Sequence, residues 1–253
     1  MTLPMTATPA WPPRSAPRLF VTGPLGGGAI VKLDGPQAHY LGKVMRAALG
    51  DVVILCDDRT GEWAAEVTAT GKRDVSLTLG ECLRPREPVP DFTLCAALLK
   101  KPHFDLVLEK ATELGVRRIQ PLLTHRVVAD KLNLDRARAI VTEAAEQCAR
   151  TALPEVVAPI KLDALLRDWP EGRVLFFADE QGGAPAANAF ARTSGPAALL
   201  TGPEGGFDEA ERAAIRTHPA AIAISLGPRI LRGETAAIAA TALWMALAGD
   251  WSG

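Results

Sequence analysis

The sequence has few residues of the kinds that hold metals or disulfides. It contains only four cysteines, Cys56, Cys82, Cys95 and Cys148, and four dispersed histidines. Because no two cysteines form a C-x-x-C pair, the pattern gives no support for a zinc site or a disulfide framework, and it suits a reducing cytosol. We therefore expect a cytoplasmic protein without a bound metal.

The chain also lacks an excess of charge and a long apolar run. Its net charge is −1, so any contact with nucleic acid has to come from a local basic patch. The longest apolar run, Ala236–Ala248, is broken by Thr241 and is too short to span a bilayer. Prolines in residues 1–17 interrupt any apolar core that a signal peptide would need. We interpret residues 1–17 as a disordered tail and expect no membrane association.

The 253 residues suffice for one large domain or two modest ones, and the pattern changes near residue 84. Between residues 18 and 83, short apolar runs accompany a single helical stretch, Pro36–Ala48. The segment Asp57–Gly61 between two of these runs is a hairpin signal. This part is predicted to be a small β-barrel. The expected strands are Leu19–Val21, Ala29–Leu33, Val52–Cys56, Trp63–Val67 and Val75–Leu79.

Closely spaced prolines in residues 84–91 indicate a stiff linker. Beyond it, the strand-like runs and helical stretches follow one another at longer intervals. Residues 92–253 alternate strand-like runs with helical stretches, so we predict an α/β domain whose mostly parallel sheet is covered on both faces. One helix should end at Gly115 as its C′ residue. The expected strands are Phe92–Leu99, Ile119–Leu123, Val174–Ala178, Ala197–Thr201 and Ala221–Leu226.

The helical stretch Leu134–Arg150 carries a cysteine that could suggest a nucleophile. Its apolar face has Ile140, Ala144 and Cys148 at helical spacing. A packing role for Cys148 is therefore favoured over a chemical one.

Two loops near the C-terminus are candidate ligand sites. In open α/β sheets, ligands bind in the crevice beyond the carboxyl ends of the strands. The first loop, Gly202–Gly206, follows a predicted strand and precedes a helix at which Asp208 and Glu211 have capping-box spacing. It fits neither G-x-G-x-x-G nor the P-loop pattern, which disfavours a nucleotide enzyme of Rossmann type. Alone, it could equally be an ordinary strand-to-helix turn. The second loop carries Arg229, Arg232 and Glu234.

Taken together, the two loops point to a family. The stretch GPEGGFDEAE at residues 202–211, followed by SLGPRILRGETA at residues 225–236, resembles the ribosomal RNA small subunit methyltransferase E family of the SPOUT methyltransferases. Further similar motifs stand in the family's order: RLFV at 18–21, HYLGKVMR at 39–46, LEKATELGV at 108–116 and EAAEQCAR at 143–150. The resemblance covers nearly the whole chain except its first residues. One departure is Gly233, where the family usually has threonine.

The resemblance implies a PUA-like first domain over residues 18–83 and a SPOUT domain with a deep trefoil knot over residues 92–253. It implies a homodimer formed through the closing helix Thr235–Ala248. The implied cofactor, S-adenosylmethionine, has no phosphate and carries a positive sulfonium, which Glu204 in the first loop would tolerate. Cofactor-binding residues would be Leu200, Thr201, Gly202, Pro203, Glu204, Gly205, Leu226, Gly227, Ile230, Leu231, Arg232, Thr235 and Ala236.

The implied activity is methylation of N3 of a uridine in 16S ribosomal RNA of the small subunit. Uracil N3 must lose its proton to attack the methyl group, which leaves negative charge shared with O2 and O4. We expect Arg232 to stabilise that charge, and Glu234 to orient the base or accept the proton. The alternative is a non-catalytic RNA-binding protein that keeps the fold. Candidates for phosphate contacts, each of which could instead be merely solubilising, are Arg18, Lys43, Arg46, Arg117, Arg118 and Arg126.

Overall fold

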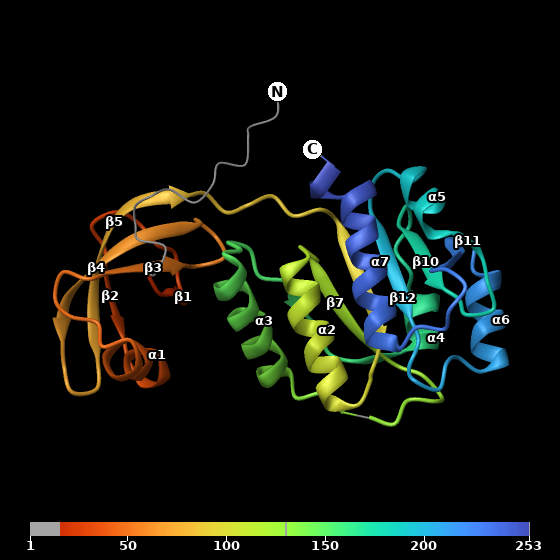
Figure 1. Ribbon diagram of the computed structural model, residues 1–253, viewed down its shortest axis with the longest axis horizontal. Helices are drawn as coiled ribbons and strands as arrows, with labels where there is room; N and C mark the ends of the chain where they lie inside the picture. The colour runs from red at the N-terminus through yellow and green to blue at the C-terminus, as the bar shows by residue number, and fades with distance from the viewer. Residues whose placement is uncertain (1–15, 130, 253) are drawn as a thin grey trace. The chain divides into compact units, whose positions relative to one another are not determined.

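The computed structural model describes residues 16–129 and 131–252 (Figure 1). The expected disordered tail, residues 1–17, therefore lies outside the described residues except for its last two positions. The chain divides into two compact units. The first consists of Met1–Pro88 and Ala145–Ala152, and the second of Val89–Ala144 and Leu153–Gly253.

The first unit is built on a five-stranded sheet with the order β1-β3-β4-β5-β2. Strands β1 and β3 pair in parallel, and the other neighbours pair antiparallel. The hairpin predicted at Asp57–Gly61 is confirmed, because β3 and β4 pair antiparallel on either side of it. All five predicted strands are present: β1 Arg18–Phe20, β2 Ile30–Leu33, β3 Val52–Cys56, β4 Glu62–Thr70 and β5 Val75–Arg84.

The single helical stretch of this unit is shorter than predicted. Helix α1, Gly35–His39, continues into a π-helical turn, η1, which covers Tyr40–Val44. Leu41 is fully buried in the core of the unit and anchors this turn. The prediction of a helix up to Ala48 is wrong, because Arg46 adopts a left-handed backbone with a φ of 55°, which a continuous right-handed helix cannot contain.

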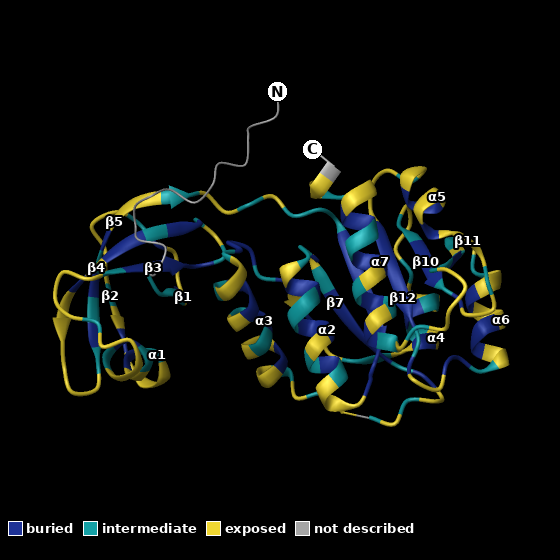
Figure 2. Ribbon diagram, in the orientation of Figure 1, coloured by how far each residue is buried: buried dark blue, intermediate teal, exposed yellow. Residues whose placement is uncertain are grey.

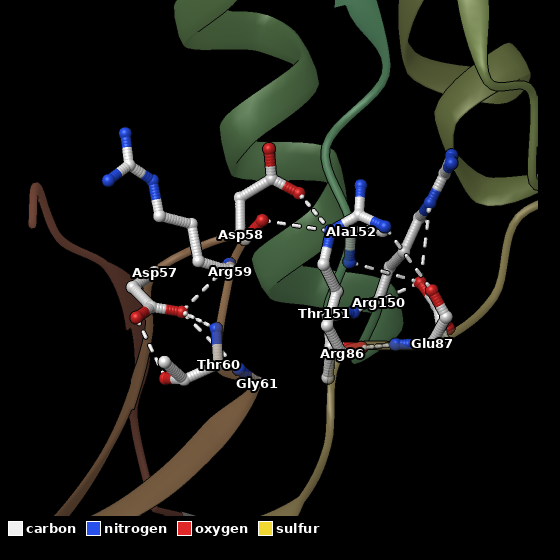
Figure 3. A network of polar contacts seen from close by, with 10 residues as sticks. All are labelled: Asp57, Asp58, Arg59, Thr60, Gly61, Arg86, Glu87, Arg150, Thr151 and Ala152. Atoms are coloured by element: carbon white, nitrogen blue, oxygen red, sulfur yellow. Dashed lines mark hydrogen bonds and ion pairs between the residues drawn. The ribbon is translucent and has the colours of Figure 1, made fainter. Parts of the chain in front are cut away.

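A segment from far along the chain, residues 145–152, belongs to the first unit. Oε1 of Glu87 accepts hydrogen bonds from the backbone N–H groups of Thr151 at 3.1 Å and Ala152 at 3.2 Å (Figure 3). The backbone N–H of Glu87 donates in turn to Oγ1 of Thr151 at 2.9 Å. Next to it, Nε of Arg86 donates to the backbone oxygen of Asp58 at 2.8 Å. The contacts of Glu87 bind the segment to the proline-rich stretch, and the contact of Arg86 binds that stretch to the hairpin at Asp57–Gly61. No local sequence pattern signals these contacts.

The second unit contains an eight-stranded sheet with the order β11-β13-β10-β12-β6-β7-β8, and β9 pairs with β7. Every pairing is parallel, which confirms the predicted parallel sheet. The knot implied by the resemblance stays a prediction. The strands are β6 Phe92–Ala97, β7 Arg118–Leu123, β8 Glu155–Val156, β9 Ile160–Lys161, β10 Val174–Ala178, β11 Ala184–Pro185, β12 Ala197–Thr201 and β13 Ala221–Ser225.

Helices cover both faces of this sheet, as predicted. In the central strand β12, Leu199 packs into a cluster with α2, α3, α5 and α7, whereas Leu200 packs with α4 and α6 on the other face. Figure 1 shows α2 and α7 side by side, and Figure 2 shows β12 and β7 as largely buried. The helices are α2 Lys101–Glu113, α3 Leu134–Cys148, α4 Leu162–Arg167, α5 Ala186–Ala191, α6 Glu209–Thr217, α7 Gly233–Leu247 and the short 3-10 helix η2 Asp250–Ser252.

The closing helix α7 is buried on one face in this chain. Trp244 stacks on Phe92 with ring centroids 4.1 Å apart, and Met245 is fully buried. Leu247 and Ala239, by contrast, are exposed. The apolar side chains of this helix are therefore not all buried within one chain.

The C-terminal ends of α2 and α3 test the predictions made for Gly115 and Cys148. Gly115 follows α2 with a φ of +95°, which confirms it as the C′ residue. Cys148 is exposed, so the prediction that it packs on an apolar face is wrong. The reason is that Cys148 is the last residue of α3, and Ala149 leaves the helix with a φ of 61°. Ala144, one turn earlier, is buried as predicted.

Candidate active site

A pocket in the second unit lies beyond the carboxyl ends of three neighbouring parallel strands, β10, β12 and β13. Its walls come from residues 178–180, 201–203, 206–207 and 224–231, which follow or end those strands, and from Arg212 of α6. Two wall residues, Gly233 and Ala236, belong to the start of α7. The pocket thus occupies the position in which open α/β sheets bind ligands.

Most of the predicted cofactor-binding residues meet at this pocket. Leu200 lies underneath it as a fully buried core residue. Glu204, Gly205, Arg232 and Thr235 are neighbours of wall residues in the chain but are not part of the walls. The eight that line the pocket are Thr201, Gly202, Pro203, Leu226, Gly227, Ile230, Leu231 and Ala236.

The structure adds a charged group to the wall that sequence reasoning missed. Asp179 and Glu180 directly follow the strand that was predicted at Val174–Ala178, so the strand-end rule could have found them. Asp179 has a fully buried side chain and pairs with Arg212 and Arg216. Arg212 also contacts Glu180, with Nη2 and Oε1 2.7 Å apart. Two carboxylates thus engage the guanidinium of Arg212, so it is not available to bind a phosphate.

The two predicted loops pack against each other without space for side chains. A Cβ on Gly233 would lie 2.8 Å from Cδ2 of Leu99 and 3.0 Å from the carbonyl oxygen of Gly202. A Cβ on Gly202 would in turn lie 2.9 Å from the ring of Phe207. The glycines therefore bring backbone atoms to the pocket wall, where N–H and C=O groups can bind a ligand at close range.

The nature of the wall fits S-adenosylmethionine. A ligand without a phosphate needs no free arginine, and two carboxylates beside the pocket tolerate a positive sulfonium. Backbone groups of the glycine-rich loop and the apolar side chains of Leu226 and Leu231 are suited to an adenosine group. Within the described residues, the buried Nε of Arg212 has no hydrogen-bond partner.

The predicted catalytic residues lie at the start of α7. Arg232 is the N-cap residue, its side chain is exposed, and no acidic side chain in the described ranges pairs with it. Glu234 stands in the first helical turn with a side chain that is 10% exposed, and its Oε1 lies 3.0 Å from Nδ1 of His103. His103 stands in the first turn of α2. Sequence reasoning treated it as one of four dispersed histidines and missed this contact.

Glu204 makes a contact that the sequence did not predict. Its Oε1 accepts a hydrogen bond from the backbone N–H of Lys100 at 3.0 Å. The carboxylate therefore connects the loop after β12 to the start of α2, and a direct contact between Glu204 and the cofactor stays a prediction.

A cluster of possible metal ligands lies at the start of α6. Atoms of His125, Asp208 and Glu211 come within 4.8 Å of one another. The predicted capping box is confirmed, since Asp208 accepts from the backbone N–H of Glu211 at 2.8 Å and Glu211 accepts from that of Asp208 at 3.1 Å. Nδ1 of His125 lies 2.6 Å from Oδ2 of Asp208. These contacts account for the cluster without a metal, and the absence of a metal site stays a prediction.

The same contacts shift two pKa values. The hydrogen bond to Asp208, with the nearby charge of Glu211, raises the pKa of His125. The backbone N–H of Glu211, followed by the hydrogen bond to His125, lowers the pKa of Asp208. Both groups are therefore charged together over a wider pH range than free side chains would be.

Three of the predicted RNA-binding residues lie in the first unit. The side chain of Arg18 is only 12% exposed and pairs with Glu62 at 2.6 Å, so a phosphate contact does not suit it and we correct that expectation. Its early position in the chain gave no sign of this burial. Lys43 and Arg46 are exposed on and just after η1, and no acidic residue of the described ranges pairs with them.

The other three predicted RNA-binding residues lie in the second unit, and each makes a hydrogen bond or ion pair within the protein. Arg126 donates to the carbonyl oxygen of Gly205 at 3.1 Å, which brings it near the glycine-rich loop. Arg117 pairs with Asp91 at 3.5 Å, and Arg118 pairs with Glu155 at 3.2 Å. Because surface ion pairs are weak, these arginines remain able to exchange their partners for phosphates.

Comparisons with known proteins agree with the geometry. A family model described as RNA methyltransferase domain matches residues 85–245, and a second, described as RNA methyltransferase PUA domain, matches residues 33–80. The PUA-like character expected of the first unit is thereby confirmed. No helix among the described residues is long and apolar enough to cross a membrane.

Individual relatives cover nearly the whole chain. Ribosomal RNA small subunit methyltransferase E of Synechocystis sp. is 36% identical over 85% of this chain and 72% of its own length. The enzyme of the same name from Rickettsia conorii is 29% identical over 89% of this chain and 93% of its own. The crystal structure of the Neisseria gonorrhoeae protein of this name, bound to S-adenosyl methionine, has a TM-score of 0.84 at 29% identity and covers 93% of this chain and 99% of that one. Pocket, fold and relatives agree, and the chain belongs to the ribosomal RNA small subunit methyltransferase E family.

Proposed function

We propose that this protein uses S-adenosylmethionine to methylate N3 of one uridine in the decoding region of 16S ribosomal RNA. The observation that carries the proposal is the meeting of the two family loops at one pocket beyond the strand ends, with Arg232 and Glu234 at the start of α7 beside it. The names of the relatives and the ligand in the Neisseria gonorrhoeae structure support the same reaction and cofactor.

The cofactor supplies an electrophilic methyl group on a positive sulfur. Backbone groups at Gly202 and Gly227 hold it, and the apolar side chains of Leu226 and Leu231 exclude water from it. Arg232, which has no acidic partner in the described ranges, stabilises the negative charge that develops on O2 and O4 of uracil. Because this charge is absent from the neutral base, the arginine acts mainly on the transition state.

The RNA would be held by exposed basic residues, namely Lys43, Arg46, Arg117, Arg118 and Arg126. The apolar side chains that α7 leaves exposed support a homodimer formed through this helix. We keep the expected organisation of a PUA-like domain over residues 18–83, a linker over residues 84–91 and a SPOUT domain over residues 92–253. A substrate in the small ribosomal subunit supports the expected cytoplasmic location.

Nucleoside mass spectrometry tests the proposal. Small subunits that lack the modification are incubated with the protein and S-adenosylmethionine, and the 16S RNA is digested and mapped. We expect new 3-methyluridine at a single position in the decoding region. If no methylated base forms although calorimetry shows that S-adenosylmethionine binds, a non-catalytic RNA-binding protein becomes the better description.

A further inference from the structure

His103 and Glu234 form a pair beside the pocket that no motif of the sequence identified. The two residues stand in the first turns of α2 and α7, which pack against each other. Nδ1 of His103 lies 3.0 Å from Oε1 of Glu234. The histidine side chain is 36% exposed and that of the glutamate only 10%, so the imidazole is the more accessible partner.

We propose that His103 is the general base that removes the N3 proton of uracil, and that Glu234 is the residue that positions it. The inference rests on the proposed methyl transfer to a uridine. A neutral imidazole has one nitrogen that donates and one that accepts. A carboxylate 3.0 Å from Nδ1 favours the tautomer with the proton on that nitrogen, which leaves the lone pair of Nε2 for a substrate.

The contacts of the other candidates favour this assignment. Asp179 and Glu180 are engaged by Arg212. Glu204 accepts the backbone N–H of Lys100. In the described part of the chain, no hydrogen bond engages Nε2 of His103, so it keeps a free acceptor atom.

The environment of Glu234 suits a positioning role. It is the second residue of α7, where the unpaired N–H groups of the helix start favour a negative charge. When His103 takes up a proton, the carboxylate at 3.0 Å stabilises the resulting imidazolium. This reverses the role expected from sequence, in which Glu234 itself was a possible proton acceptor.

The step balances without a further reactant. The N3–H bond breaks and its proton goes to Nε2 of His103, while the N3 electron pair forms a bond to the methyl carbon. The bond between that carbon and sulfur breaks, and its electron pair stays on sulfur as a neutral thioether. Arg232 stabilises the charge on the uracil oxygens, and the imidazolium returns its proton to water after 3-methyluridine leaves.

Nitrogen NMR of the protein alone tests the pair without any turnover. The two ring nitrogens of His103, assigned through the loss of their signals in His103→Gln, report which one carries the proton. We expect the Nδ1–H tautomer in the native protein and a mixture of tautomers in Glu234→Gln. A native protein with the proton on Nε2 would overturn the proposal.

Single-turnover methylation tests the base itself. With saturating S-adenosylmethionine, we expect His103→Ala to slow methyl transfer by about 10²–10⁴-fold, with unchanged cofactor affinity and partial rescue by added imidazole. His103→Gln serves as a second variant if His103→Ala does not fold. The matched control is His125→Gln, which removes a histidine that also contacts a carboxylate, at 2.6 Å from Asp208, but whose partner caps α6 and does not stand at the start of α7 beside Arg232. It should methylate at the native rate.

The outcomes separate the two proposals. An active native protein whose His103→Ala variant is equally fast would overturn the role of His103 and leave the methyltransferase function standing. A native protein that binds the cofactor but methylates no RNA would contradict the proposed function. In that case the tautomer measurement still decides whether Glu234 directs the imidazole.

Discussion

The carboxylate of Glu204 and the backbone N–H of Lys100 are joined by a 3.0 Å hydrogen bond between two loops that are distant in the sequence. Lys100 is the N-cap residue of α2, and its carbonyl oxygen accepts the backbone N–H of His103 at 2.9 Å. The glycine-rich loop after β12 and the helix that carries His103 are therefore mechanically connected. Changes at Glu204 should reach both the cofactor and the base.

Replacement of Glu204 tests this connection. Glu204→Ala leaves the Lys100 N–H to water, so we expect stability to fall by about 1 kcal/mol and cofactor affinity to fall several-fold. Glu204→Gln keeps an acceptor oxygen and should retain most of the affinity. Thermal unfolding and calorimetric titration with S-adenosylmethionine measure both effects. If the two variants have equal stability and equal cofactor affinity, the acceptor oxygen of residue 204 does not connect the loop to α2.

Gly233 stands where the family usually has threonine, and its surroundings are tight. Gly233→Ala would move the end of Leu99 and press on the Gly202 carbonyl, which is 3.0 Å from the added carbon. Overpacking typically costs about 1–3 kcal/mol, while alanine gains up to about 1 kcal/mol over glycine in a helix. We expect a net loss of stability of up to about 2 kcal/mol, measured by thermal unfolding, and weaker cofactor binding, measured by calorimetry. Gly26→Ala, at a glycine with open space around it, is the control and should bind normally.

Arg232 should act on the rate more than on binding. We expect Arg232→Ala to slow single-turnover methylation by about 10²–10³-fold, as loss of a donor to a developing anion does, with a smaller loss of cofactor affinity. Arg232→Lys should recover part of the rate, because lysine keeps the charge but not the planar donors. Arg192→Ala, an exposed arginine outside the pocket walls, is the control. A folded Arg232→Ala with the native rate would disprove the role.

Substitutions of Arg18 and Arg46 should have different effects, the first on stability and the second on RNA binding. Arg18→Ala leaves the buried Glu62 with Arg84 as its remaining partner, so we expect a loss of up to about 3 kcal/mol in the free energy of unfolding. Arg46→Ala should leave stability unchanged, weaken RNA binding and lower the salt slope of binding by about 1. Denaturant unfolding and salt-dependent binding distinguish them. An Arg18→Ala variant that is fully stable but binds RNA poorly would restore the original expectation.

The pair of His125 and Asp208 predicts a pH dependence of stability. The raised pKa of His125 means that its contribution is fully present below its unfolded pKa, about 6.5, and disappears as pH rises through the folded value. The lowered pKa of Asp208 means that its contribution is present above about 4 and disappears as pH falls through the folded value. The stability that the pair adds should therefore be largest between about pH 4 and pH 6.5.

Asp208→Asn tests the pair because asparagine can still cap α6 but carries no charge. Urea unfolding should give the native protein a higher free energy of unfolding than this variant between about pH 4 and pH 6.5. The difference should shrink above and below that range. A difference that does not vary with pH would mean that only the cap matters.

The local features of the fold were predictable from sequence. The capping box of Asp208 and Glu211, the hairpin at Asp57–Gly61 and the helix end at Gly115 all depend on residues within a few positions of each other. The alternation of strand-like and helical periods also predicted the parallel sheet, because a parallel connection needs a crossover. Eight pocket residues followed from the family motifs and from the rule that ligands bind at strand ends.

The remaining features depend on which segments the tertiary structure brings together. The contact of His103 with Glu234, the pairing of Asp179 with Arg212 and the burial of Arg18 against Glu62 each join residues from different elements. A periodic pattern states which face of an element is buried but not which other element covers it. The strand order, in which β12 lies between β10 and β6, decides which loops meet, and that order results from packing of the whole sheet. Sequence alone thus determined the elements and the two loops, whereas tertiary packing decided which charged groups meet beside the pocket.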